Sequence, residues 1–492
     1  MACDDREEWK KAEQVEIDNM IKHNVWSIIP LLPTHHTIPS TWAYKKKLGA
    51  DNQVTKFKAR ICAQGFRQTY GLNFELKYAP TGKPSSLLFL LSIAMEHQLL
   101  IHQLNVKSAF LTCNLDKEVL MTPPAGYLVD KQVVLRLNKA IYGLKQALLA
   151  WYRRLSTFLN SVGFSTSVAD PCVFWRQKPS PLWIFAHVDD LIIIGTDPLL
   201  FQTQMEEEFQ IKYMGDASFL LGMKLDCLDS GLALHQSQYI QRKLMEFNVI
   251  DLPPSSCPLD PRSHLRKASV PDRHQFLALN LSYQALIDSL NYLSILTRPD
   301  ISFCLSWKST KQATVSLSST EAEYKALADS CKDIVWLQNL STEILDIKEL
   351  LSTIVHVDNR GAIDLALSQV SQNGFRTKHM DLRLHFIRDL IAQKLIKISY
   401  ISTHKNISDF LTKPVGRLNI SRAVATFACD AQTLSALCSQ APSMPGCQNT
   451  GFLADVDADT IMLSLSEEMR SDELGATSPV QGTAQGTNHH DD

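Results

Sequence analysis

Two adjacent carboxylates, Asp189 and Asp190, lie between the apolar runs 182–186 and 191–194. Neighbouring carboxylates repel each other, and a divalent cation bound to both relieves that repulsion. Enzymes that transfer nucleotides hold two such cations about 3.5–4 Å apart, one at the attacking oxygen and one at the leaving oxygen. Aspartate is also common in turns, so the dipeptide by itself favours a plain turn. Other motifs must decide between the two interpretations.

The elements that position this bend follow from the spacing of apolar residues. The runs on either side of the acids predict two strands of a hairpin. Helical periodicity predicts helices at residues 6–23, 85–100, 144–159 and 199–213. Alternation of apolar and polar residues predicts a β-hairpin at 42–68 and short strands at 99–106 and 118–121. The acid pair is therefore expected in a region of mixed helices and sheets.

A second globular region is expected at about residues 302–426. Its pattern predicts helices at 320–340 and 362–367 and strands at 353–357 and 397–401. The Pro- and Ser-rich segment 252–272 predicts a linker or an exposed loop. After residue 430 the composition shifts to polar and acidic residues, which indicates disorder with one short helix at 461–469.

Composition narrows the class of protein. The chain has 492 residues, of which 45% are hydrophobic and 20% charged, as in ordinary globular proteins. The net charge of −2 gives no global positive field, so any nucleic-acid binding must come from a local basic patch. Eleven scattered cysteines without a C-x-x-C pair predict reduced thiols in an intracellular protein of the cytoplasm, the nucleus or both. The apolar stretch 87–95 is too short to span a bilayer, so no membrane partner is expected.

Several longer motifs occur in a fixed order along the chain. The first group is Lys56–Phe66, Leu104–Leu111, Leu137–Ala147, Ala150–Tyr152 and His187–Asp190, and the second is Ser306–Gln312, Ser318–Tyr324, Val357–Asn359, Arg376–Asp381 and Asp409–Pro414. With these motifs the chain resembles the Pol polyproteins of copia-type long-terminal-repeat retrotransposons over most of residues 5–415. The first group resembles the family's reverse transcriptase and the second its ribonuclease H part.

The resemblance implies an α+β fold: a right-hand polymerase with fingers, palm and partial thumb, followed by a truncated ribonuclease H-like α/β domain. The implied domains are an N-terminal helix and connector (1–40), reverse transcriptase fingers and palm (41–250), a linker and partial thumb-connection (251–301), the truncated ribonuclease H-like domain (302–427) and a disordered tail (428–492).

The resemblance places Asp189 and Asp190 at the polymerase metal site, where the family has a third aspartate on an earlier strand. This chain has Asn105 at that position. An amide offers one neutral oxygen, whereas Mg²⁺ prefers anionic oxygen ligands. The resemblance therefore implies a weakened two-metal magnesium site. His187 stands where the family has tyrosine, and either alters primer positioning or fills the same space.

Residues expected to contact nucleotide and template also come from the resemblance: Lys56, Lys58, Arg60, Phe110, Gly143, Lys145 and Gln146. Lys56, Lys58 and Arg60 lie on the 42–68 hairpin and would grip phosphates, although a solvated charged face is the alternative. Phe110 would pack under the sugar and exclude a 2′-hydroxyl, or serve as a core aromatic. Gly143 would allow a close backbone approach at the start of a helix.

Ribonuclease H chemistry uses two metals held by four carboxylates in related enzymes. The resemblance assigns Glu323, Asp358 and Asp409 to three of them, and the first carboxylate and the strands around it are missing. Without those strands the sheet is expected to expose an unpaired edge. The alternative for Glu323 is a capping box with Thr320. The fragment is expected to have little or no activity.

The resemblance thus implies an RNA-directed DNA polymerase that uses an RNA or DNA template–primer, deoxynucleoside triphosphates and Mg²⁺, impaired by Asn105 and by the ribonuclease H deletion. The rival hypothesis is a nucleic-acid-binding or interaction protein without catalysis, and a third is a decayed copy that folds poorly. The oligomeric state is left open by the sequence.

Overall fold

The computed structural model describes most of the chain in segments. These are residues 5–48, 54–127, 132–228, 231–253, 255, 258, 268–279, 281–302, 318–345, 352–368, 378–411, 415–420, 423 and 460–462. The described part divides into two compact units, the first made of residues 1–217 with 343–345 and the second of 218–342 with 346–492. No helix in the described segments is long and apolar enough to cross a membrane.

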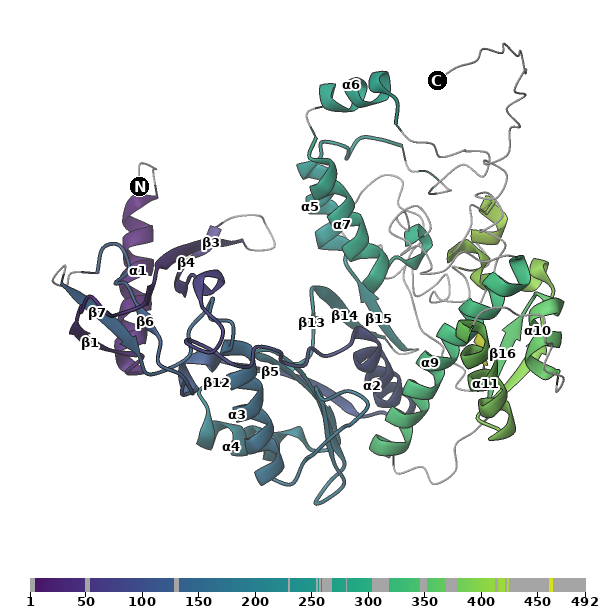
Figure 1. Ribbon diagram of the computed structural model, residues 1–492, viewed down its shortest axis with the longest axis horizontal. Helices are drawn as coiled ribbons and strands as arrows, with labels where there is room; N and C mark the ends of the chain where they lie inside the picture. The colour runs from purple at the N-terminus through teal and green to yellow at the C-terminus, as the bar shows by residue number, and fades with distance from the viewer. Residues whose placement is uncertain are drawn as a thin grey trace, which may run out of the picture. The chain divides into compact units, whose positions relative to one another are not determined.

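The first unit begins with a helix that lies along a two-stranded hairpin (Figure 1). The helix is α1 (Arg6–Lys22), and the hairpin strands are β3 (Ser40–Leu48) and β4 (Val54–Ala63). A four-stranded sheet follows, in the order β1 (Trp26–Pro30), β7 (Val133–Leu137), β6 (Leu120–Met121) and β2 (Thr37–Ile38). The predicted hairpin at 42–68 is confirmed, with its second strand ending earlier, at Ala63.

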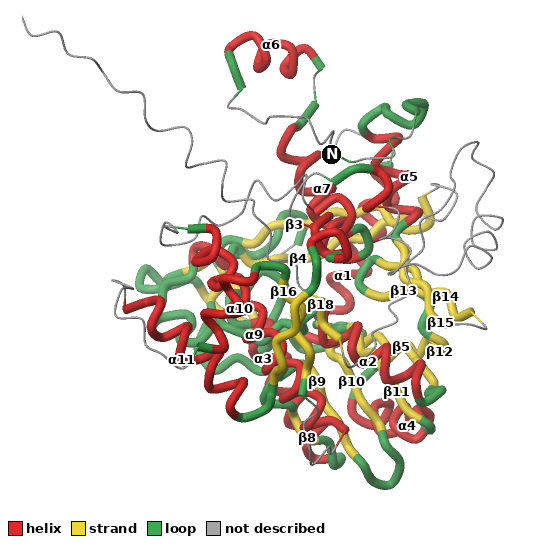
Figure 2. The backbone as a smooth tube through the Cα atoms, turned by 90° about the vertical axis from the view of Figure 1, so that its right-hand side faces the viewer, coloured by secondary structure: helices red, strands yellow, loops and turns green. Residues whose placement is uncertain are grey.

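A six-stranded sheet forms the centre of the first unit, and its strands run side by side in Figure 2. Its order is β12 (Ile211–Asp216), β5 (Leu100–Val106), β11 (Asp190–Gly195), β10 (Leu182–His187), β9 (Val173–Arg176) and β8 (Ser165–Thr166). Strands β10 and β11 are central because their apolar side chains are buried on both faces. The helices of this region are α2 (Pro84–Glu96), α3 (Ala147–Ser161) and α4 (Pro198–Glu208).

The second unit has an antiparallel and a parallel sheet. The antiparallel sheet contains β13 (Phe219–Leu220), β14 (Met223–Leu228) and β15 (Gly231–His235), and the parallel one has β16 (Thr353–Val357) between β17 (Ile396–Tyr400) and β18 (Thr460–Met462). The helices are α5 (Ser237–Glu246), α6 (Val270–Ala278), α7 (Tyr283–Leu296), α10 (Arg360–Leu367), α11 (Lys378–Ala392) and α9 (Ser319–Leu345), whose last three residues belong to the first unit.

Together these elements confirm the α+β class, and most predicted elements lie within a few residues of their expected bounds. Two helices were predicted too long. The expected helix 85–100 ends at Glu96, and the expected helix 199–213 ends at Glu208, because Ile211 and Tyr213 alternate with exposed polar residues and pair with β5. The domain boundaries given above stay a prediction. The motif at Ser306–Gln312 lies outside the described residues.

Two expectations for the second unit were wrong. The helix expected at 461–469 is a strand where the chain is described, because Thr460–Met462 pairs with β16. In the described part of this sheet β16 is central, and the expectation of an unpaired sheet edge stays a prediction. Thr320 does not cap the long helix: the Ser318 hydroxyl accepts a hydrogen bond from the Glu321 amide at 3.1 Å, so the cap lies two residues earlier than predicted.

Candidate active site

The acid pair lies at a tight hairpin bend, as the sequence predicts. His187 at the end of β10 pairs with Asp190 at the start of β11, so only Val188 and Asp189 form the turn. Val188 has a φ of 56°, a left-handed conformation that costs a β-branched residue about 1–2 kcal/mol. Such strain persists only where neighbouring groups hold the backbone in place.

Two hydrogen bonds from different elements hold this bend. The indole of Trp151 on α3 donates to the Val188 carbonyl at 2.6 Å. The Val106 amide at the end of β5 donates to the Asp189 carbonyl at 2.8 Å. Because both partners are buried, the carboxylates of the pair project from a fixed backbone. This rigidity suits residues that must hold a ligand in one geometry.

Asn105 lies directly opposite the second acid. Strands β5 and β11 are antiparallel, and their register pairs Asn105 with Asp190. The Asn105 side-chain amide donates a hydrogen bond to Asp190 Oδ1, with an N–O distance of 2.9 Å. Both side chains are only partly exposed. The structure therefore brings the degenerate position and the acid pair together, and it fills one acceptor of Asp190 with an N–H group.

The residues at this bend fit a pair of divalent cations poorly. Two carboxylates are hard oxygen ligands of the right type. The third position presents an amide that already donates its N–H to one of them. Within the described segments, no three Asp, Glu, His or Cys side chains form a group that would hold a metal ion.

The basic hairpin contributes two of its predicted cations to the surroundings of Asp189. Burial lowers the pKa of Lys58, the nearby cation of Arg60 lowers it further, and the Asp189 carboxylate opposes both. Lys56 lies further out on β4, where it is exposed and pairs in register with Lys47. Lys58 and Arg60 thus lie within electrostatic range of the acid pair, whereas Lys56 faces solvent.

Two groups that the sequence analysis left unassigned join this cluster. Tyr142 lies below the Arg60 guanidinium, whose Cζ is 4.6 Å from the ring centroid. Burial raises the pKa of Tyr142, Arg60 lowers it, and Asp189 raises it again. Glu16 on α1 accepts a hydrogen bond from the Ile61 amide at 3.3 Å. Burial raises the pKa of Glu16, and that backbone hydrogen bond opposes the change.

Gly143 makes the close backbone approach predicted for it. Its φ is +88°, and a Cβ at this position would lie 2.1 Å from the carbonyl oxygen of Ala63. Gly65 meets the same turn from the other side, since its Cβ would lie 2.0 Å from the Gly143 carbonyl oxygen. The Gly143 turn is therefore joined to the end of β4. The helix that follows begins only at Ala147.

Lys145 and Gln146 are held by the loop that follows β4. The Gln68 side chain donates to Gln146 Oε1 at 2.9 Å and accepts from the Lys145 amide at 2.8 Å. Gln146 in turn donates to the Asn73 carbonyl at 2.9 Å. The ammonium of Lys145 lies 4.7 Å from the centroid of the Phe74 ring. Gln68 was missed by sequence reasoning because no motif assigned a role to it.

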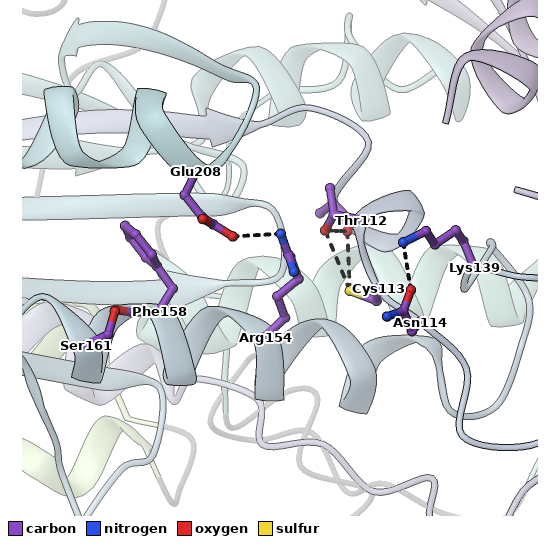
Figure 3. Close-up of polar contacts among 9 residues, drawn as sticks. Thr112, Cys113, Asn114, Lys139, Arg154, Phe158, Ser161 and Glu208 are labelled. Atoms are coloured by element: carbon purple, nitrogen blue, oxygen red, sulfur yellow. Dashed lines mark hydrogen bonds and ion pairs between the residues drawn. The ribbon is translucent and has the colours of Figure 1, made fainter. Parts of the chain in front are cut away.

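A cavity of about 500 Å³ lies beside α3 and includes Gln146 in its wall. Figure 3 shows its polar contacts, among them the ion pair between Arg154 on α3 and Glu208 at the end of α4, 2.7 Å long. The thiol of Cys113 faces the same region and bonds the neighbouring hydroxyl of Thr112. Apart from Gln146, the cavity walls contain none of the residues predicted from the motifs.

The predicted ribonuclease H carboxylates all lie in the second unit. Glu323 is buried on α9, Asp358 follows β16 and is half-buried, and Asp409 is buried in a short 3-10 helix, Ile407–Leu411. Glu321, two residues from Glu323, instead forms a buried ion pair with Lys325 at 2.8 Å. This agrees with the expectation that Glu321 and Glu323, two residues apart on a helix, point to different sides.

Comparison with known proteins places the polymerase region in a family. Residues 23–261 match the family model described as reverse transcriptase (RNA-dependent DNA polymerase). The chain is 30% identical to the Retrovirus-related Pol polyprotein from transposon RE1 of Arabidopsis thaliana, over 84% of this chain and 33% of that protein. It is also 30% identical to the corresponding polyprotein from transposon TNT 1-94 of Nicotiana tabacum, over 83% of this chain and 37% of that protein.

A more distant sequence match is also to a transposon polyprotein. The Transposon Ty1-DR5 Gag-Pol polyprotein of Saccharomyces cerevisiae is 22% identical over 84% of this chain and 28% of that protein. A foamy viral protease-reverse transcriptase, solved in complex with double-stranded DNA, aligns with a TM-score of 0.41 at 11% identity, over 80% of this chain and 70% of that one. The chain spans about a third of the length of the plant polyproteins. Residues 23–261 belong to the reverse transcriptase family, and the chain is a relative of the Pol polyproteins of copia-type retrotransposons.

Proposed function

We propose that this chain is an RNA-directed DNA polymerase by descent whose nucleotidyl transfer is strongly weakened at Asn105. Its substrates would be a template–primer and deoxynucleoside triphosphates, as expected from the motifs. The observation that carries the proposal is the hydrogen bond from the Asn105 amide to Asp190 Oδ1, 2.9 Å long, at the centre of the acid pair's surroundings. An aspartate in that position would instead add a third anionic oxygen ligand.

The charge balance around the bend supports a weakened centre. Bound magnesium supplies activation of the primer hydroxyl and stabilisation of the leaving pyrophosphate in two-metal enzymes. Such a centre depends on anionic ligands, and here Asn105 contributes none. The cations of Lys58 and Arg60 remain near Asp189, which favours binding of a triphosphate or a nucleic-acid backbone even where the chemistry is slow.

For the second unit we propose a ribonuclease H remnant with little activity. Glu323, Asp358 and Asp409 are the carboxylates that the family pattern assigns to it, and the first of the four is absent from the chain. Two-metal hydrolysis with an incomplete ligand set is expected to be slow.

Primer extension tests the polymerase proposal. The native chain, Asn105→Asp, and Asn105→Asp combined with Asp189→Asn are each given an RNA template, a DNA primer and all four deoxynucleotides, with magnesium and separately with manganese. The native chain should make little product, Asn105→Asp should make clearly more, and the double variant should lose that gain. If Asn105→Asp extends no better than the native chain, while both bind the template–primer equally, then Asn105 is not the defect.

The second candidate is a nucleic-acid-binding protein without catalysis. It is favoured by the same hydrogen bond, because the Asn105 amide stabilises the Asp190 carboxylate without a cation. The two candidates differ in one outcome. Binding of template–primer that weakens with salt, together with no extension by either the native chain or Asn105→Asp, would select the binding protein.

A further inference from the structure

Tyr142 lies at the junction of two elements that the polymerase motifs single out. Its backbone carbonyl accepts a hydrogen bond from the Ala63 amide at 2.8 Å, at the end of β4. The next residue, Gly143, is pressed against the same alanine, as described above. Tyr142 is thus fixed to the basic hairpin through its main chain, and its side chain has little freedom to move away.

The ring of Tyr142 contacts two of the residues expected to face the incoming nucleotide. It meets the Phe110 ring edge to face, with 5.0 Å between centroids and an interplanar angle of 73°. The guanidinium of Arg60 stacks on it, with Cζ 4.6 Å from the centroid. Phe110 belongs to the short 3-10 helix Ala109–Thr112, which follows β5, whereas Arg60 belongs to β4. The Tyr142 ring therefore contacts both the residue expected at the nucleotide's sugar and the residue expected at its triphosphate.

These contacts restrict the residue that excludes a 2′-hydroxyl. An edge-to-face partner limits the rotation of a phenyl ring, because turning it would break the contact or create overlap. Phe110 is partly buried against the core, and the Tyr142 ring adds an edge-to-face contact that restrains its position. The same ring also restrains Arg60, whose guanidinium stacks on it.

Resting on the proposed function, we infer that Tyr142 is a positioning residue that sets the discrimination between deoxyribo- and ribonucleoside triphosphates by fixing Phe110, while it holds Arg60 for the triphosphate. Loss of the ring would let Phe110 move and admit a 2′-hydroxyl. Loss of the hydroxyl alone would leave both ring contacts in place. The aromatic ring, rather than the phenol group, is the part that matters for sugar selection.

Nucleotide binding without chemistry tests this inference. The native chain is bound to a template–primer whose primer ends in a dideoxynucleotide, so no bond can form and the rate of nucleotidyl transfer does not affect the result. The dissociation constants of the complementary deoxynucleotide and ribonucleotide are then measured by the stabilisation of the complex in a gel-shift assay with magnesium. The readout is the dissociation constant of the ribonucleotide divided by that of the deoxynucleotide. A change in folding stability alone would not alter this ratio.

The variants are Tyr142→Phe, Tyr142→Leu and, as a control, Tyr127→Leu, which removes a similar edge contact from Trp26 at 5.7 Å. We expect Tyr142→Leu to lower the ratio roughly three- to tenfold, the size of one lost aromatic pair. Tyr142→Phe and Tyr127→Leu should keep the native ratio. If Tyr142→Leu does not melt cooperatively, Tyr142→His replaces it, and the same fall is expected because the smaller ring does not reach Phe110.

The outcomes separate the two proposals. A native chain that binds template–primer and prefers the deoxynucleotide, together with a leucine variant whose ratio stays within about twofold of native, overturns the role of Tyr142 and leaves the proposed function standing. A native chain that binds neither template–primer nor nucleotide overturns both. A ratio that falls equally in Tyr127→Leu would show a general loosening, and would also overturn the role of Tyr142.

Discussion

Restoring the missing carboxylate should make the free protein less stable. In the native chain Asp190 accepts a hydrogen bond from Asn105 at 2.9 Å. Asn105→Asp removes that donor and places a second negative charge at the same distance. The substitution expected to rescue activity is therefore expected to cost stability when no cation is present.

The magnitude follows from the two changes. A hydrogen bond to a charged group contributes about 1.5–3 kcal/mol. Two unit charges about 4 Å apart repel by up to about 4 kcal/mol at an effective dielectric constant near 20. Both side chains are partly exposed, so rotation and solvent will remove much of that repulsion. A total of about 2–4 kcal/mol remains, which lowers the melting temperature of a unit of this size by roughly 5–15 °C.

The assay is thermal unfolding of the native chain, Asn105→Asp and Asn105→Ala, each with EDTA and with magnesium. Asn105→Ala loses the hydrogen bond without adding charge, so it should fall between the other two in EDTA. Magnesium should recover most of the loss in Asn105→Asp and change Asn105→Ala little. The reasoning is refuted if Asn105→Asp melts at or above the native temperature in EDTA.

Two other predictions follow from the described geometry. Gly143→Ala should destabilise the chain by about 3 kcal/mol or more, since its Cβ would meet the Ala63 carbonyl at 2.1 Å. Gly71→Ala is the control: its φ is +80° but it lies in open space, so it should cost only about 1 kcal/mol. Urea titration of both variants measures these changes in the free energy of unfolding. Burial raises the pKa of the Cys172 and Cys331 thiols to about 12, so both stay protonated when the pH rises from about 7 to 9. Iodoacetamide should label exposed Cys227 first and these two only on unfolding, and mass spectrometry that finds Cys172 labelled early in the folded chain would contradict this.

The central hairpin was predictable because its signal is local. Two runs of β-branched and apolar residues can bury both faces only as central strands, and the acids between them then fall at the bend. The proximity of Asn105 to Asp190 was expected from the family resemblance, and the register of β5 and β11 places them opposite each other. The roles of these residues in catalysis remain predictions.

Other parts depend on contacts that no local pattern encodes. Glu16, Arg60 and Tyr142 come together from a helix, a strand and a turn that lie far apart in the sequence. The sequence did not decide which residue caps the long helix, because Ser318 and Thr320 each have a glutamate three residues later. In the structure Ser318 forms the cap. The strand Thr460–Met462 was missed because it forms only by pairing with β16.

Manganese binding distinguishes a defective cation site from an intact one at the acid pair. Electron paramagnetic resonance would follow free Mn²⁺ as it is titrated into the native chain, Asn105→Asp and the double variant Asn105→Asp, Asp189→Asn, each with the dideoxy-terminated template–primer. Asn105→Asp should gain a site at least about tenfold tighter than any in the native chain, because anionic oxygens are the ligands this ion prefers, and the double variant should lose it. Equal tight binding by the native chain and Asn105→Asp would contradict the assignment of Asn105 as the missing ligand.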